Sequence, residues 1–236
     1  MGRNQFFQFK QFRVEQGRAA MKVGIDGVLL GAWAAFGHEK FVLDIGCGTG
    51  LLALMAAQRS TAFVDAVEIE PEAALDADAN FAASPWSSRL QLYRTDFKGF
   101  ETQKRYQHII SNPPFFDETP RSSDPKRNKA RHSESLSLNE LIERSVDLLH
   151  PDGKISLILP AGKEKHLRSL ARTNLLYPNR YASVFPDINK PAHRILAELS
   201  FQPKTEITEA IYIRNADSGE YTEQYKQITR DFYLAF

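Results

Sequence analysis

The sequence predicts a doubly wound α/β fold, in which helices cover both faces of a largely parallel sheet. From about residue 40, short runs rich in β-branched and aromatic residues alternate with helical stretches, the pattern of repeated strand-helix units. A glycine-rich turn at residues 46–50 joins the first run to the first helix. The 236 residues are enough for one domain with a full core. We therefore expect a single domain.

The expected elements follow one another in strand-helix order. Strands are expected at Phe41–Ile45, Val64–Ile69, Leu90–Thr95, His108–Ser111, Ile155–Leu159, Tyr181–Phe185 and Ile195–Phe201. Helices are expected at Leu51–Arg59, Pro71–Ala82, Leu138–Leu149 and Gly162–Asn174. A turn is expected at Asp152-Gly153. The last two strands are expected to be antiparallel, because only the loop 186–192 joins them.

Residues 1–40 are interpreted as a flank or lid, 41–202 as the core and 203–236 as a C-terminal extension. The flank predicts a short aromatic hairpin around Phe7 to Val14, followed by a helix over about Val28–Phe36. The extension predicts one more strand from Ile207 and a helix near Thr222–Tyr233.

The composition is that of an ordinary globular protein. Hydrophobic residues make up 42% of the chain and charged residues 25%, and no apolar run approaches the roughly 20 residues that cross a bilayer. The single cysteine, Cys47, excludes an internal disulfide. The six histidines lack metal-ligand spacing, so no metal is expected. With no secretory signal, we expect a cytoplasmic monomer that does not bind membranes.

The glycine-rich turn follows Asp44 and places Gly46, Gly48 and Gly50 between a strand and a helix. Glycine allows the backbone to turn tightly and to approach a ligand. Dehydrogenases use the spacing G-x-G-x-x-G to bring a helix N-terminus to a pyrophosphate, whereas the spacing here is G-x-G-x-G. That spacing suits the amino-acid half of S-adenosylmethionine, with Asp44 acting on its ammonium directly or through water.

Acidic residues also end the next two strands. Glu68 lies about twenty residues after the glycine turn, where a carboxylate can accept hydrogen bonds from both ribose hydroxyls; Glu70 is a second candidate. Asp96 ends the third strand and can accept from the adenine amino group, while the backbone at Phe97 meets the ring. Each acid has an alternative role as a helix cap or a solvated strand end. Three acids at three successive strand ends favour a cofactor site.

The segment Asn112-Pro113-Pro114-Phe115 follows the fourth strand. An exocyclic amine on an aromatic base is a poor nucleophile, because its lone pair is delocalised into the ring. The side-chain carbonyl of Asn112 and the backbone carbonyl of Pro113 can accept both amine hydrogens and direct the lone pair at a sulfonium methyl. Pro114 offers no competing N–H, and Phe115 can stack on the target ring. A plain turn is the alternative, and we predict no strong general base.

Together, residues 44–50, Glu68, Asp96 and the Asn-Pro-Pro-Phe segment resemble the class I S-adenosylmethionine-dependent amino-methyltransferases, over about residues 38–202. Residues 21–33 resemble the segment before the glycine turn in bacterial tRNA adenine N6-methyltransferases, whose target is adenine 37 of a valine tRNA. The resemblance implies a Rossmann-like sheet of seven strands with an antiparallel last strand. It further implies S-adenosyl-L-methionine as cofactor, tRNA as partner, and Lys22 and Asp26 at the methionine end of the cofactor.

A basic run follows the Asn-Pro-Pro-Phe segment directly. Residues 121–131 hold five basic residues against one acid, Asp124. This run is positioned to meet phosphates beside an extruded base, although a solvated loop is the alternative. The segment from Lys190 to Arg194 also resembles the tRNA subfamily. The RNA-binding candidates are Arg121, Lys126, Arg127, Lys129, Arg131, Lys190 and Arg194.

Other acceptors and functions stay open on the residues alone. The same delocalised nitrogen lone pair occurs in three other acceptors: guanine N2 of ribosomal RNA, adenine N6 of DNA and a protein glutamine. The glutamine enzymes more often have tyrosine where this chain has Phe115, and they carry an added N-terminal helical domain. A non-catalytic nucleic-acid-binding module is disfavoured by the intact Asn112 and glycine turn. A nicotinamide oxidoreductase is disfavoured by the glycine spacing.

Overall fold

A mixed sheet forms the centre of the computed structural model, which describes residues 4–114 and 136–236. Its eight described strands are β3 Phe41–Ile45, β4 Phe63–Glu68, β5 Leu90–Arg94, β6 Tyr106–Ser111, β7 Leu149–Pro160, β8 Tyr177–Phe185, β9 Arg194–Ser200 and β10 Ile207–Tyr212. The helices are α1 Ile25–Trp33, α2 Leu51–Arg59, α3 Pro71–Ala83, α5 Leu138–Leu148, α6 Glu164–Thr173 and α7 Glu223–Thr229.

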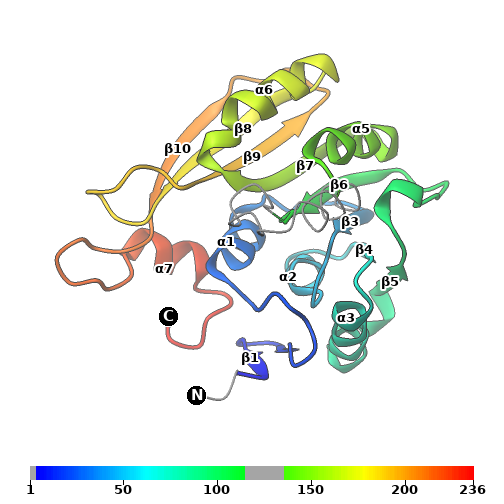
Figure 1. Cartoon of the computed structure of the whole chain (residues 1–236), viewed down its shortest axis with the longest axis horizontal. Helices are drawn as coiled ribbons and strands as arrows, with labels where there is room; N and C mark the ends of the chain where they lie inside the picture. The colour runs from blue at the N-terminus through cyan, green and yellow to red at the C-terminus, as the bar shows by residue number, and fades with distance from the viewer. Residues whose placement is uncertain (1–3, 115–135) are drawn as a thin grey trace, which may run out of the picture.

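The strands lie in the order β10-β8-β9-β7-β6-β3-β4-β5. Strands β3 to β7 pair in parallel, whereas β9 is antiparallel to both of its neighbours, β7 and β8. Helices α5 and α6 cover one face of the sheet, and α1, α2, α3 and α7 cover the other (Figure 1). The doubly wound fold and the reversed β9 are confirmed.

The main sheet was expected to have seven strands, and it has one more. The strand expected in the C-terminal extension, β10, joins the edge of the main sheet and pairs in parallel with β8, from Ile207 opposite Arg180 to Tyr212 opposite Phe185. Joining the edge buries Ile211 and Ile213 in the core. The extension is therefore part of the sheet.

Strand β7 begins earlier than expected and contains the predicted turn. Tyr106 lies opposite Leu149 and His108 lies opposite Lys154, so residues 150–153 bulge from the ladder. A Cβ on Gly153 would lie 2.8 Å from the backbone oxygen of Tyr106. The Asp152-Gly153 signal thus marks a bulge within a strand, where only glycine fits.

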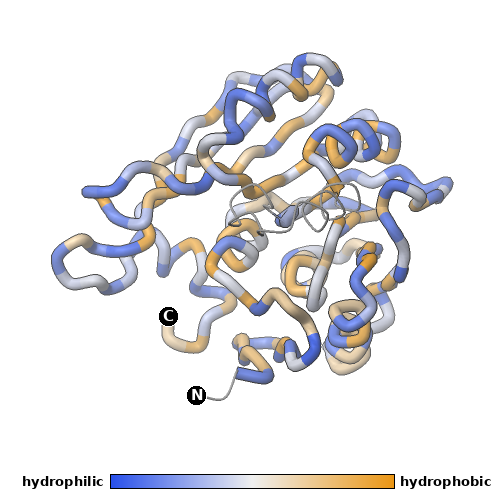
Figure 2. Tube along the Cα trace, viewed as in Figure 1, coloured by the Kyte–Doolittle hydropathy of each residue, from blue (hydrophilic) through white to orange (hydrophobic). Residues whose placement is uncertain are grey.

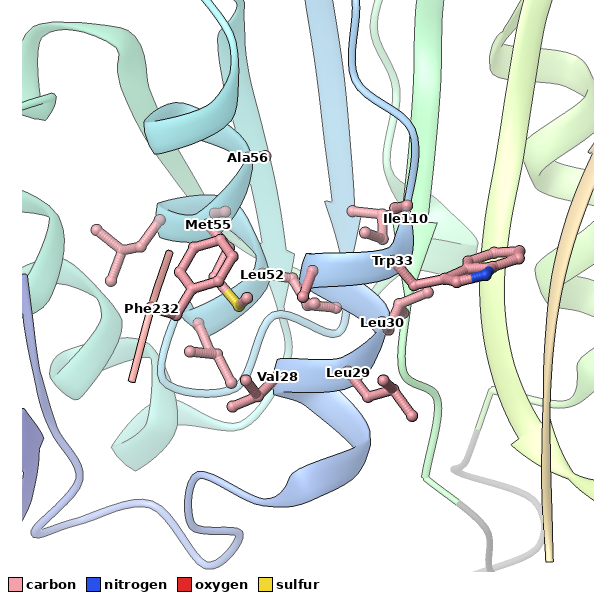
Figure 3. Close-up of a cluster of buried hydrophobic side chains, with 14 of the residues drawn as sticks. Val28, Leu29, Leu30, Trp33, Leu52, Met55, Ala56, Ile110 and Phe232 are labelled. Carbon is pink, nitrogen blue, oxygen red and sulfur yellow. The ribbon is translucent and has the colours of Figure 1, made fainter. Parts of the chain in front are cut away.

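Helix α1 begins and ends about three residues before its expected bounds. Its last carbonyls are satisfied from outside, because the Arg59 guanidinium donates to the backbone oxygens of Gly31 and Ala34 at 2.8 and 2.5 Å. Gly31 permits close contact with α2, since a Cβ there would lie 2.5 Å from the sulfur of Met55. Figure 3 shows α1 and α2 side by side in the buried cluster.

The predicted aromatic hairpin is present as β1 Phe6–Gln8 and β2 Arg13–Glu15. It packs on the C-terminal segment, where Phe9 stacks on Tyr233 and the Lys10 N–H donates to the carbonyl of Phe232 at 2.9 Å. The predicted C-terminal helix is present as α7. Apolar residues concentrate along the strands and the inner helix faces (Figure 2). None of the helices in the described ranges is long and apolar enough to cross a membrane.

Candidate functional site

The predicted site residues converge at one edge of the sheet. Strands β6, β3, β4 and β5 are neighbours and parallel, so their carboxyl ends lie along the same edge, where open α/β sheets bind ligands. The glycine turn leaves β3 there, Glu68 ends β4, Asp96 follows β5 and Asn112 follows β6. Segments that are up to seventy residues apart in the chain thus form one candidate site.

The glycine turn has the backbone that its composition predicts. Gly46, Gly48 and Gly50 have φ angles of 67°, 56° and 82°, which favour glycine. A Cβ on Gly50 would also lie 2.4 Å from the Phe81 ring, so α3 packs directly against the turn. Among the described residues other than the adjacent ones in the chain, no atom lies within 4 Å of the Cβ positions of Gly46 and Gly48. These two glycines therefore leave room for a ligand against the backbone.

Asp44 lies on β3 beneath the turn and is completely buried. Its Oδ2 accepts from the Ala53 N–H at 3.0 Å, whereas its buried Oδ1 has no partner within the described part of the chain. Burial raises the pKa of Asp44 to about 8; the Ala53 hydrogen bond lowers it, and the nearby Glu68 raises it further. An unpartnered oxygen of this kind fits the ammonium of an amino-acid ligand.

Glu68 is 7% exposed, and it shapes the turn as well as facing the site. Its Oε2 accepts from the Gly48 N–H at 2.7 Å, and its Oε1 accepts from the Glu70 N–H at 2.8 Å. Each carboxylate oxygen has a second lone pair, so both oxygens can still accept from ribose hydroxyls. The sequence did not indicate the bond to Gly48, which fixes the turn from the neighbouring strand.

Two of the predicted cofactor acids act as caps. The exposed Glu70 accepts from the Ala73 N–H at 2.7 Å and caps α3. Asp96 accepts through Oδ1 from the Lys98 N–H at 3.0 Å and caps the short helix Phe97–Gly99, in which Phe97 is buried. Both hydrogen bonds agree with the alternative role of these acids as helix caps. Each cap uses one carboxylate oxygen, so Asp96 keeps Oδ2 and Glu70 keeps Oε1 for a further partner.

Sequence reasoning missed Ile69, an apolar side chain at the same edge. Ile69 follows β4 directly, between Glu68 and Glu70, and is 59% exposed. A large aliphatic side chain at an exposed strand end contributes nothing to the core. Because the expected strand Val64–Ile69 ended at this residue, its exposure is evident only from the structure.

The end of β6 presents the Asn-Pro-Pro segment. The Ser111 hydroxyl donates to the carbonyl of Ile45 at 2.7 Å and ties β6 to the end of β3. Asn112 is half-buried, Pro113 is buried and Pro114 is exposed. Within residues 4–114 and 136–236, no hydrogen bond engages the Asn112 side chain. A Cβ on Gly27 would lie 3.8 Å from Asn112 Nδ2, so α1 borders the amide.

The remaining predicted site residues either bond to other parts of the described chain or lie outside the described residues. Lys22 donates to the carbonyls of Gln16 and Ala19, so it braces its own segment. Asp26 and Arg194, predicted for cofactor and RNA respectively, form an ion pair with each other at 2.8 Å. Lys190 is exposed and pairs with Asp187 at 3.1 Å. Outside the described residues lie Phe115, Arg121, Lys126, Arg127, Lys129 and Arg131.

Known proteins resemble this chain along nearly its whole length. The model of the family described as "Methyltransferase small domain" matches residues 28–173. A tRNA1(Val) (adenine(37)-N6)-methyltransferase of Parabacteroides distasonis is 43% identical over 233 residues, which cover 98% of each chain. A protein of the same description from Vibrio cholerae is 43% identical over 232 residues, which cover 98% of this chain and 96% of that protein.

The fold has solved counterparts at lower identity. The crystal structure of a predicted O-methyltransferase from Agrobacterium tumefaciens matches with a TM-score of 0.68 and 16% identity, over 88% of this chain and 96% of that one. The family model and the two relatives confirm the resemblance that the glycine turn and the Asn-Pro-Pro segment indicated. This chain belongs to the methyltransferase small-domain family.

Proposed function

We propose that the chain uses S-adenosyl-L-methionine to methylate N6 of adenine 37 in a valine tRNA. The observation that carries this proposal is the placement of Asn112 at the same sheet edge as a buried carboxylate, Asp44, that has an unpartnered oxygen. The likeness to tRNA1(Val) (adenine(37)-N6)-methyltransferases supports the same substrate.

The residues present fit the cofactor. Asp44 Oδ1 would accept from its ammonium, and the open faces of Gly46 and Gly48 would allow its amino-acid half against the backbone. Glu68 would accept from the ribose hydroxyls. The free oxygen of Asp96 would accept from the adenine amino group, and the exposed Ile69 would pack on the adenine ring. The cofactor would supply an electrophilic methyl group on a sulfonium.

The protein's part in the reaction is to position the adenine amine. The side-chain carbonyl of Asn112 and the backbone carbonyl of Pro113 accept its two hydrogens, which leaves the nitrogen lone pair directed at the methyl carbon. The nitrogen would supply the electron pair of the new N–C bond, and the bound cofactor would supply the methyl group and keep the electrons of the S–C bond on its sulfur. The cationic amine then loses a proton to water. No side chain has to act as a strong base.

The RNA would approach across the end of β6 and the start of β9, which lie on the same side of the sheet. We propose that Arg121, Lys126, Arg127, Lys129 and Arg131 contact phosphates, together with Lys190, which is 63% exposed at its side chain. Asp26 of the Asp26–Arg194 pair directly precedes Gly27, the residue of α1 that borders the amide of Asn112. We propose that Arg194 shapes the acceptor pocket through this pair.

Transfer of labelled methyl to total RNA from cells that lack this protein, followed by nucleoside analysis, tests the proposal. Label in N6-methyladenosine of the tRNA fraction supports the reaction, the atom and the substrate class together. Label only in protein or DNA would keep the chemistry and overturn the choice of partner.

A further inference from the structure

Two buried polar side chains on α3 hold the segment that leads from β2 to α1. We call residues 15–23 the strap. Asp76 and Asn80 lie one turn apart on α3 and are 1% and 2% exposed. Buried polar groups cost stability unless they are hydrogen-bonded. Here all the bonds that the structure gives these two side chains run to the strap or to the glycine turn, and none to α3 itself.

The bonds of Asp76 fix the middle of the strap. Its Oδ2 accepts from the backbone N–H groups of Arg18 and Ala19, both at 2.9 Å, and its Oδ1 accepts from the Arg18 guanidinium at 3.2 Å. The strap also closes on itself, because Gln16 Oε1 accepts from the Val23 N–H at 2.8 Å. The strap is therefore a defined loop with an anchored middle.

Asn80 links the strap to the glycine turn. Its Oδ1 accepts from the Glu15 N–H at 2.7 Å, and its Nδ2 donates to the Glu15 carbonyl at 2.9 Å. The second amide hydrogen goes to the carbonyl of Thr49 at 2.9 Å. Thr49 lies between Gly48 and Gly50, so one amide group joins the start of the strap to the centre of the turn.

The strap ends beside the other half of the site. It leads directly into α1, whose Gly27 borders the Asn112 amide. The strap thus spans from the glycine turn toward Asn112. Within the described chain, neither of its anchors on α3 bonds to Asn112 or Pro113.

We infer that Asp76 and Asn80 are positioning residues for cofactor binding, which hold the strap and the glycine turn in one fixed arrangement. The inference rests on the proposed function, because the strap borders a cofactor only if the turn binds one. Loss of an anchor leaves Asn112 and Pro113 in place. It therefore weakens binding of the cofactor and of its product equally, and spares the chemical step at saturating cofactor.

The test measures S-adenosylhomocysteine binding by calorimetry and the steady-state kinetics of full-length variants. Asn80→Ala should raise the Kd at least about tenfold, equivalent to roughly 1.4 kcal/mol. It should raise the KM for S-adenosylmethionine similarly and leave kcat within about threefold. Asp76→Ala should behave alike. Asp76→Asn keeps one oxygen for the two strap N–H groups and should restore most of the affinity.

Two controls separate anchoring from general damage. Asp78→Asn removes an exposed carboxylate of the same helix, which pairs with Arg94, and should leave the Kd unchanged. Ile142→Val trims a buried side chain in the cluster under α5; it should lower the Tm without changing the Kd at 25 °C. Hydrogen exchange should quicken in residues 15–23 of Asn80→Ala and stay unchanged in β6 and β7.

The outcomes are distinguishable. If the wild-type chain does not bind S-adenosylhomocysteine, the proposed function fails first. If the wild type binds and both alanine variants bind equally well, the inference is wrong. A loss of kcat at saturating cofactor, with an unchanged KM, would also overturn it. Should Asn80→Ala not fold, the comparison of Asp76→Ala with Asp76→Asn decides the question alone.

Discussion

At the scale of single residues, Asp44 has the most informative environment. Its pKa is raised to about 8 in the folded chain and returns to the ordinary value near 4 on unfolding. Between these values the folded chain holds an additional proton, so Asp44 lowers the free energy of unfolding progressively as pH rises from about 4 to about 8. Asp44→Asn should therefore be more stable than wild type at pH 8, by on the order of a few kcal/mol, and similar at pH 4. Urea unfolding at both pH values measures this; a difference that is independent of pH would contradict it.

Asn112 carries a second prediction at this scale. Asn112→Ala removes one acceptor for the amine and leaves the glycine turn, Asp44 and Glu68 untouched. We expect kcat to fall by about 10²- to 10³-fold, the usual loss for one positioning hydrogen-bonding group. The Kd for S-adenosylhomocysteine should stay within about threefold. Calorimetry measures the Kd, and single-turnover methyl transfer measures the rate of the chemical step. A large loss of cofactor binding would mean that the amide of Asn112 serves the cofactor instead.

At the scale of elements, the Asp26–Arg194 pair joins the start of α1 to the start of β9 at 2.8 Å. The side chains are 25% and 19% exposed, so the pair is partly shielded and should be coupled by about 1 kcal/mol. Asp26→Ala and Arg194→Ala, alone and together, give the coupling from thermal or urea unfolding. The same cycle on the KM for tRNA shows whether the pair also shapes the acceptor pocket. If the effects of the two single substitutions add up in both measurements, the ion pair neither stabilises the fold nor shapes the acceptor pocket.

The elements also show what a sequence can predict. The bounds of β3 and α2 match expectation to the residue, because a buried strand, a glycine turn and an apolar helix are each local patterns. The end of α1 does not match its expected bound. Its last carbonyls accept hydrogen bonds from Arg59, which lies on α2 and is not part of the local pattern. The place of β10 depends on pairing with β8, which no local pattern encodes. Likewise, the sequence predicts acidic residues at the strand ends. It does not show that Glu70 caps α3, because that role depends on a hydrogen bond from the Ala73 N–H.

At the scale of the whole molecule, we expect that tRNA binding can be weakened by substitution without a change in cofactor binding. Replacing Arg127, Lys129 and Arg131 with alanine should weaken tRNA binding and reduce the slope of log K against log salt by about 2 to 3, since each lost phosphate contact contributes about 0.7 to 0.9. The Kd for S-adenosylhomocysteine should not change, because these residues follow the Asn-Pro-Pro segment and not the glycine turn. Filter binding over a salt series measures the slope. An unchanged slope would move the RNA surface to another part of the molecule.

The most direct test of the proposed substrate is methyl transfer to a synthetic valine tRNA, compared with the same tRNA carrying guanosine in place of adenosine 37. Mass spectrometry of nuclease fragments locates and counts the methyl groups. We predict one methyl group per molecule, on N6 of adenine 37, and no transfer to the guanosine variant. Transfer to both molecules, or to another nucleotide, would contradict the proposed substrate while leaving the fold and cofactor site intact.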